Sequence, residues 1–125
     1  TIFVPTSSMF NWSSNISAML YTFENIPFMS QHAIHYGYGT MYTSAYQKID
    51  EAIKERVKSL AKHQIKNPKL ISTGMSLGGA LAGIHAYRLS CMYPESDIYN
   101  ISFGSPKFAS DNFYTDYCCT QIDMI

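Results

Sequence analysis

The feature that most constrains this chain is the segment Gly74-Met75-Ser76-Leu77-Gly78-Gly79, which joins a predicted strand to a predicted helix. The strand is expected over residues 69–73 and the helix over residues 77–92. Glycines two residues before and two residues after Ser76 leave room for a sharp, strained turn at that serine. A G-x-S-x-G pattern in this context is typical of a serine that is presented as a nucleophile at the start of a helix.

Small residues follow Ser76 and keep the start of the helix thin, so that it can pack close to the sheet: Gly79, Ala80, Ala82 and Gly83. The N-terminus of a helix directs N–H groups and partial positive charge at the serine, which makes the N–H of Leu77 a natural donor to an oxyanion. An ordinary glycine-rich turn and a phosphate loop are the alternatives. A phosphate loop is disfavoured because no Gly-Lys-Ser or Gly-Lys-Thr follows.

Strands and helices alternate along the remaining chain. We expect strands at residues 1–4, 69–73, 97–103 and 117–122, and helices at residues 9–20, 43–64, 77–92 and 111–116. The pattern over residues 21–40 is irregular. The clearest helix, residues 43–64, has apolar residues at three- and four-residue steps: Tyr46, Ile49, Ile53, Val57 and Leu60. This alternation predicts an α/β fold, with a mostly parallel sheet and flanking helices.

Composition and charge narrow the class of partner. The 125 residues suffice for one compact domain, and 46% of them are hydrophobic. The charges of nine basic and nine acidic residues cancel, so there is no electrostatic reason to expect a nucleic acid or an anionic membrane surface as a binding partner. No apolar run reaches the roughly 18 residues of a membrane span. The expected partner is therefore neither a nucleic acid nor the bilayer interior.

Cysteines and sequons bear on metals and on the compartment. Cys91, Cys118 and Cys119 leave at least one cysteine unpaired, and no Cys/His spacing suggests a metal. Three N-glycosylation sequons favour a secreted protein, with chance occurrence as the alternative, and the compartment stays open: Asn11-Trp12-Ser13, Asn15-Ile16-Ser17 and Asn100-Ile101-Ser102.

Residues 74–82 closely resemble the G-H-S-L-G-G-A-L-A segment of the class 3 (fungal-type) lipases, which belong to the α/β-hydrolase superfamily. The departure is Met75, where that family usually has His. Residues 35–38 are similar to its H-x-G-F segment, and residues 104–107, with Phe113 further on, to its G-x-P-R segment and following Phe. The resemblance implies an α/β-hydrolase fold with a nucleophile elbow and the activity of a serine ester hydrolase.

The resemblance also assigns roles. Asp123 looks like the Asp of the D-x-V-P segment that orients the catalytic His, with an exposed loop Asp as the alternative. The turn at residues 4–6 matches the family's R-G-T/S turn, which makes the N–H of Thr6 the first oxyanion donor; Val4 and Pro5 depart from that pattern. Residues 7–20 correspond to a lid that contacts a lipid surface, with a short core helix as the alternative.

No histidine follows Asp123, although the resemblance places the catalytic His there. The four histidines all come earlier: His32, His35, His63 and His85. His85 lies nine residues beyond Ser76 on the same predicted helix. That places it roughly 13 Å along the axis, too far for a hydrogen bond to the serine. We therefore expect residues 1–125 to form a single partial α/β-hydrolase domain, truncated at both ends and a poor catalyst alone.

The implied function is a carboxylic ester hydrolase, a triacylglycerol lipase whose Ser76 and Asp123 act with a His beyond residue 125. No metal or organic cofactor is implied. A phospholipase, a feruloyl esterase and a thioesterase on the same fold are alternatives, because the sequence does not settle the acyl group or the head group. A non-catalytic lipid-binding or partner-binding homologue is a further alternative, favoured by Val4-Pro5 and Met75.

Overall fold

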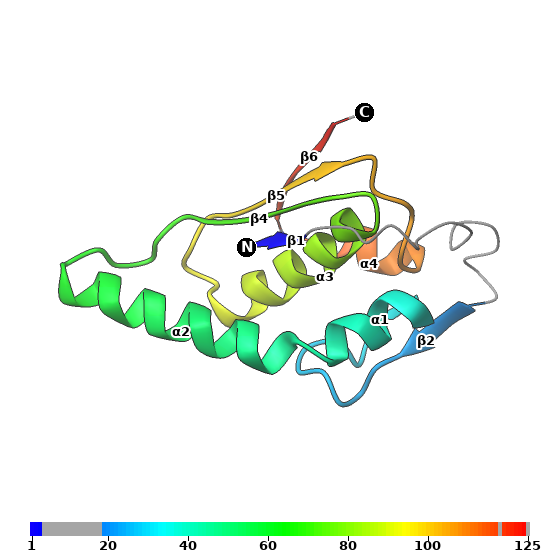
Figure 1. Cartoon of the computed structure of the whole chain (residues 1–125), viewed down its shortest axis with the longest axis horizontal. Helices are drawn as coiled ribbons and strands as arrows, with labels where there is room; N and C mark the ends of the chain where they lie inside the picture. The colour runs from blue at the N-terminus through cyan, green and yellow to red at the C-terminus, as the bar shows by residue number, and fades with distance from the viewer. Residues whose placement is uncertain (4–18, 118, 125) are drawn as a thin grey trace.

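The computed structural model describes residues 1–3, 19–117 and 119–124, and its centre is a parallel sheet. The sheet has four strands in the order β1-β4-β5-β6: β1 (Ile2–Phe3), β4 (Leu70–Met75), β5 (Ile98–Phe103) and β6 (Thr120–Met124). A separate antiparallel pair joins β2 (Leu20–Thr22) to β3 (Ala33–His35). Figure 1 shows β4 and β5 running side by side above the helices. The predicted α/β class with a mostly parallel sheet is confirmed.

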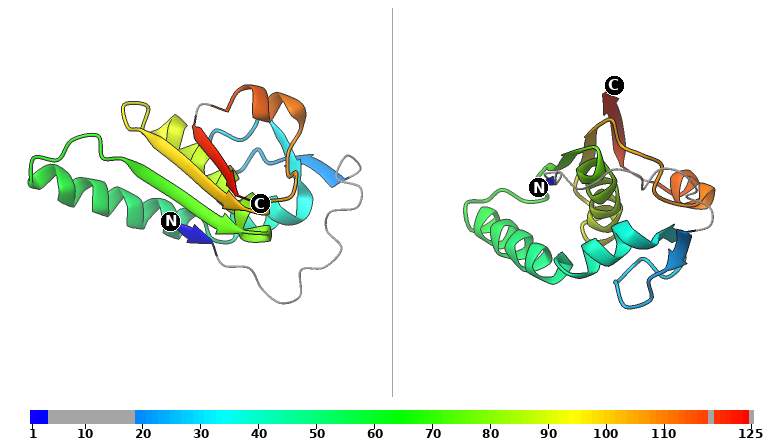
Figure 2. Two further views of the ribbon diagram at one scale, coloured as in Figure 1. Left: turned by 90° about the horizontal axis from the view of Figure 1, so that it is seen from above. Right: turned by 45° about the vertical axis from the view of Figure 1, so that its right-hand side comes forward.

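The helices occupy one side of this sheet. They are α1 (Tyr36–Thr43), α2 (Tyr46–Lys62), α3 (Leu77–Met92) and α4 (Asp111–Thr115). Helix α3 packs directly on β4 and β5, and α1 and α2 lie beyond it on the same side (Figure 2). Large apolar side chains on the other face of the sheet are exposed: Ile71, Met75, Phe103, Ile122 and Met124. Within the described part of the chain, one helical layer therefore covers one face of one sheet.

Several predicted boundaries moved by a few residues. Strand β4 continues through Met75 instead of ending at residue 73, because its pairing with β5 extends to Phe103. Strand β6 spans Thr120–Met124 instead of residues 117–122. The expected helix over residues 9–20 lies outside the described residues except for its last two, and the second of these, Leu20, begins β2.

Helix α1 is the main element that the sequence pattern missed. Residues 21–40 were expected to be irregular, and the long helix to begin near residue 43; instead a helix ends at Thr43 and α2 begins at Tyr46. Two glycines make α1 a poor helix by intrinsic propensity. Tertiary packing stabilises it, since Tyr38 and Tyr42 are buried in the core and the His35 ring accepts a hydrogen bond from the N–H of residue 37.

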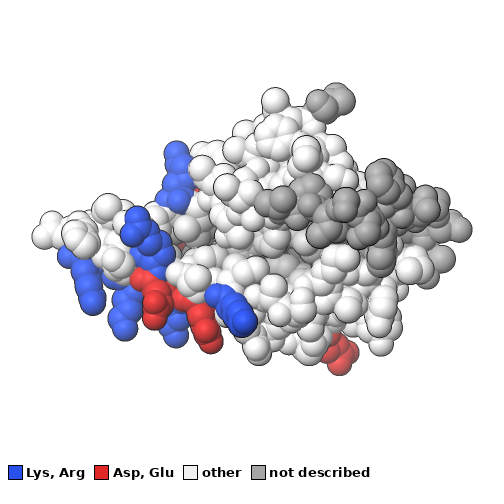
Figure 3. Space-filling model, viewed as in Figure 1, with Lys and Arg blue, Asp and Glu red and all other residues white. Residues whose placement is uncertain are grey.

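Helix α2 has the predicted amphipathic pattern but buries it only in part. Its apolar stripe, from Tyr46 to Leu60, is half-buried, and no residue of the helix is fully buried. Its Lys, Arg, Asp and Glu side chains form the charged region at the lower left of Figure 3, while most of the remaining visible surface is uncharged. Within the described residues, no helix combines the length and apolar character needed to cross a membrane.

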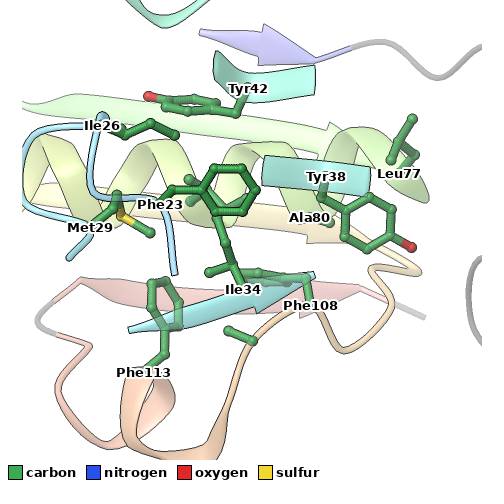
Figure 4. Packing of buried hydrophobic residues seen from close by; sticks show 12 residues of the cluster. Phe23, Ile26, Met29, Ile34, Tyr38, Tyr42, Leu77, Ala80, Phe108 and Phe113 are labelled. Carbon is green, nitrogen blue, oxygen red and sulfur yellow. The ribbon is translucent and has the colours of Figure 1, made fainter. Parts of the chain in front are cut away.

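The hydrophobic core lies between α3, α1 and the short β2–β3 pair. Figure 4 shows its members converging from these elements and from the segments around Phe108 and Phe113. Leu77 belongs to this core. The first residue of α3 is therefore anchored by packing, which holds the preceding turn at Ser76 in place.

A buried polar cluster ties α3 to the elements around it. Arg88 is 1% exposed and forms two hydrogen bonds to the carboxylate of Asp50 on α2, at 2.9 and 2.7 Å. The same guanidinium donates to the hydroxyl of Tyr42 on α1 at 3.0 Å and to the carbonyl of Pro27 at 3.1 Å. Because each partner comes from a different segment, this one side chain links α3, α2, α1 and the loop after β2.

One of the three sequons is inaccessible in the folded chain. Asn100 lies inside β5, is 2% exposed and donates from Nδ2 to Oε1 of Gln121 at 2.8 Å. A glycan needs an exposed amide, so this sequon does not support secretion. The sequons at Asn11 and Asn15 lie outside the described residues.

Candidate active site

Ser76 lies exposed at the turn between β4 and α3, with φ 54° and ψ −121°. A non-glycine residue in this backbone conformation lowers stability by about 1–3 kcal/mol, and the conformation persists only where the surrounding structure enforces it. Two backbone hydrogen bonds do so: the Ser76 N–H donates to the Phe103 carbonyl at 2.8 Å, and the Ser76 carbonyl accepts from Gly79 at 2.9 Å. The structure thus places the serine at the end of the sheet in a conformation that the fold maintains.

Glycines on either side make this turn possible. A Cβ atom at Gly74 would lie 2.1 Å from the carbonyl oxygen of Gly78, and a Cβ at Gly78 would lie 2.2 Å from that of Phe3. Both distances are far inside van der Waals contact with backbone atoms that have little freedom to move. Any larger residue at either position would push α3 away from β4 or β1, as the spacing of the motif predicts.

The N–H of Leu77 is the first in α3, so it has no acceptor within the helix. It follows Ser76 directly, and the helix dipole adds partial positive charge at this end. The side chain of Leu77 belongs to the buried hydrophobic cluster, at the end of α3 in Figure 4, and this packing fixes the backbone that carries the donor. Thr6 and residues 7–18 of the expected lid lie outside the described residues, and their roles stay predictions.

Asp123 lies within β6 and not in a loop after it, which corrects the expected position. Strand β6 pairs with β5 from Tyr99 to Phe103, and this register sets Asp123 opposite Ser102. Ser102 in turn lies opposite Gly74 of β4, two residues before Ser76. At about 4.8 Å between neighbouring strands, Asp123 and Gly74 are separated by about 10 Å across the sheet.

Two side chains that the sequence did not single out hold the carboxylate of Asp123. The Ser102 hydroxyl donates to Oδ1 at 2.6 Å, and the Gln121 amide donates to the same oxygen at 2.5 Å. Strand alternation could have indicated Gln121, because it precedes Asp123 by two residues and shares its face of β6. Ser102 could be identified only from the register between β5 and β6.

A recess of about 790 Å³ borders Asp123, between β6 and the segment that runs from Gly104 to Tyr117. Gln121 and Met124 of β6 line it together with aromatic residues of that segment, whereas Ser76 is not among its lining residues. The recess leaves space in which another side chain can approach Asp123. Among the described residues, no three His, Cys, Asp or Glu side chains gather as a metal site.

Each of the four histidines contacts residues other than Ser76 and Asp123. His85 is buried, and its Nδ1 and Nε2 lie 2.9 Å from the Tyr42 hydroxyl and 3.1 Å from a threonine hydroxyl. Burial, helped by the positive charge of Arg88, lowers the pKa of His85 to about 3, so the ring stays neutral in the core. His35 caps α1, His32 is buried in contact with a tyrosine hydroxyl, and His63 follows α2, whose far end is remote from the β4–α3 turn (Figure 1).

Two comparisons with known proteins agree with this geometry. The chain is similar to a lipase from Rhizopus microsporus var. chinensis of known crystal structure, with a TM-score of 0.61 and 19% sequence identity. The likeness covers 82% of this chain and 36% of that chain, so this chain spans about a third of that lipase and shares its fold. A family model described as lipase (class 3) matches residues 2–122. Because that model spans nearly the whole sequence, the chain belongs to the class 3 lipase family.

Proposed function

We propose that this chain carries the nucleophilic serine and the triad aspartate of a serine hydrolase that cleaves lipid esters. Ser76 is the nucleophile, and Asp123 orients a histidine that lies outside residues 1–125. The observation that carries the proposal is the strained backbone of Ser76 at the β4–α3 turn. A non-glycine residue in this conformation, exposed at the end of a parallel sheet, is costly to maintain and is typical of a nucleophile elbow.

The reaction follows from these positions. The histidine takes the proton of Ser76 as Oγ attacks the ester carbonyl, and the tetrahedral oxyanion accepts hydrogen bonds from the N–H groups of Leu77 and Thr6. Each such donor contributes about 3 kcal/mol to the barrier reduction. Collapse expels the alcohol, protonated by the histidine, and leaves an acyl group on Ser76. Water then hydrolyses this acyl-enzyme with the same histidine as base.

The spacing of the strands supports this arrangement. One imidazole ring with a hydrogen bond of about 2.8 Å at each end bridges roughly 8 Å. The separation of about 10 Å between the backbones of β4 and β6 leaves space for such a ring between Ser76 and Asp123. The recess beside Asp123 provides the access.

Family membership favours lipid esters as the substrate class, and triacylglycerol is our first choice. Phospholipids, feruloyl esters and thioesters remain to be compared in a panel of head groups and chain lengths on the full-length protein. A preference for a soluble short-chain ester would argue against a lipase, provided that the hydrolysis rate does not rise when the substrate exceeds its solubility limit.

The central test is covalent labelling of the full-length protein by a fluorophosphonate probe, with the site mapped by mass spectrometry. We expect label on Ser76, none in Ser76→Ala, and undiminished label in Ser90→Ala, which removes a hydroxyl from the same helix. A folded full-length protein that takes up no label would reject the catalytic proposal and favour a non-catalytic lipid-binding role.

A further inference from the structure

A network of hydrogen-bonded polar side chains connects β5 to β6 and ends at Asp123. Asn100 donates to Oε1 of Gln121 at 2.8 Å, and Nε2 of Gln121 donates to Oδ1 of Asp123 at 2.5 Å and to the Ser102 hydroxyl at 3.2 Å. Ser102 donates to the same carboxylate oxygen at 2.6 Å. The register makes these contacts possible, because Asn100 lies opposite Gln121 and Ser102 lies opposite Asp123.

The carboxylate of Asp123 determines which group donates in each hydrogen bond that links Asn100, Gln121 and Asp123. An ionised carboxylate only accepts, so Gln121 must present its NH₂ group to Asp123 and therefore turns its carbonyl oxygen toward Asn100. Asn100 must then donate to Gln121, which leaves its own Oδ1 buried with no partner among the described residues. A buried acceptor without a partner lowers stability, so optimisation of stability alone does not explain the arrangement.

Both hydrogen bonds to Asp123 end on the same oxygen, Oδ1. We propose that Ser102 and Gln121 are positioning residues, which fix the Asp123 carboxylate so that Oδ2 accepts the hydrogen bond of the catalytic histidine. The inference rests on the proposed function, because it assigns Asp123 to the triad. It adds to the triad two residues that touch neither the substrate nor the reacting atoms.

The physical reason lies in the exposure of Asp123. Its carboxylate is exposed at the edge of the sheet, where it would otherwise rotate freely and be solvated by water. Ser102 is 1% exposed and rigidly placed within β5, so its hydroxyl provides a fixed anchor. A carboxylate held in one orientation stabilises the imidazolium that forms in the transition state. Loss of the anchor should therefore lower kcat and leave KM nearly unchanged.

The test uses the full-length protein with Ser102→Ala, Gln121→Met and a matched control, Ser72→Ala. Ser72 is also a buried serine on a neighbouring strand, but its hydroxyl donates to the carbonyl of Ala82 at 2.9 Å. Kinetics on an activated p-nitrophenyl ester should show kcat lowered about 10- to 100-fold by Ser102→Ala, with KM within about twofold. Ser72→Ala should keep the wild-type kcat.

The same two serine substitutions are then made in an Asp123→Asn background. If Ser102 acts through Asp123, Ser102→Ala should change the residual rate less than about twofold there. An equal loss in both backgrounds would overturn the inference and indicate a merely structural role. Should Ser102→Ala fail to fold, Gln121→Met carries the test by the same criteria, because residue 121 is exposed and its replacement should disturb the fold less.

The outcomes also separate this inference from the proposed function. Full activity of Asp123→Asn would reject the triad itself. Loss of activity in Asp123→Asn, with wild-type kcat in both Ser102→Ala and Gln121→Met, would leave the triad standing and overturn the positioning role alone.

Discussion

Replacing Asp50 by alanine removes the carboxylate that both terminal nitrogens of Arg88 contact, at 2.9 and 2.7 Å. Among the described residues, the buried guanidinium would then keep only the Tyr42 hydroxyl and the Pro27 carbonyl as oxygen acceptors. Removing one partner of a buried ion pair costs about 3–5 kcal/mol. Because the Asp50 side chain is 25% exposed and water can partly replace it, we expect a loss near the lower limit, about 3 kcal/mol.

Urea unfolding of the full-length protein at pH 7 measures this loss. Asp111→Ala is the control: it breaks an ion pair of similar length, 2.8 Å to Lys107, whose two side chains are largely exposed, and no resolvable change is expected. The double variant Asp50→Leu/Arg88→Met should be more stable than Asp50→Ala, since it removes the unpaired charge as well. A loss below about 1 kcal/mol in Asp50→Ala would refute the burial of Arg88 on which the argument depends.

Two further predictions concern pH and backbone packing. Burial lowers the pKa of His85 to about 3 from 6.5, so its contribution to stability is complete above pH 6.5 and is lost as the pH falls toward 3. Urea unfolding should show a loss of up to about 3 kcal/mol between pH 6.5 and 4, and a His85→Gln variant with the same pH dependence would contradict this. Gly78→Ala places a Cβ 2.2 Å from the Phe3 carbonyl oxygen, whereas a Cβ added at Gly104, with φ 60°, would meet no heavy atom of the described residues within 4 Å apart from its chain neighbours. We expect about 3 kcal/mol for Gly78→Ala and about 1 kcal/mol for Gly104→Ala; equal shifts in calorimetric melting temperature would count against the close approach of α3 to β1.

The sequence by itself was sufficient for the elements that depend on residues close together in the chain. The β4–α3 junction could be predicted because the glycines on either side of Ser76 act on a turn only a few residues long. The same holds for α3, for β5 and for the amphipathic stripe of α2, which follow from periodicity. Alternation of these elements was enough to predict a parallel sheet.

Helix α1 could not be predicted in this way. Its two glycines and weak apolar periodicity favour irregular structure, and the helix exists because Tyr38 and Tyr42 enter a core formed by distant segments. The three-residue strands β2 and β3 are likewise too short to give a pattern. In both cases the stabilising contacts join residues far apart in the sequence.

The surroundings of Asp123 and Arg88 were decided by the tertiary structure alone. The sequence indicated Asp123 as the candidate acid, but only the register of β5 with β6 brought Ser102 to its carboxylate. Arg88 and His85 look like ordinary polar positions of a helix, and they are buried because Tyr42 lies between them and Asp50 neutralises the guanidinium. Local pattern determines which segments form strands and helices, but burying a charge or orienting a carboxylate requires a partner that only the folded chain brings within reach.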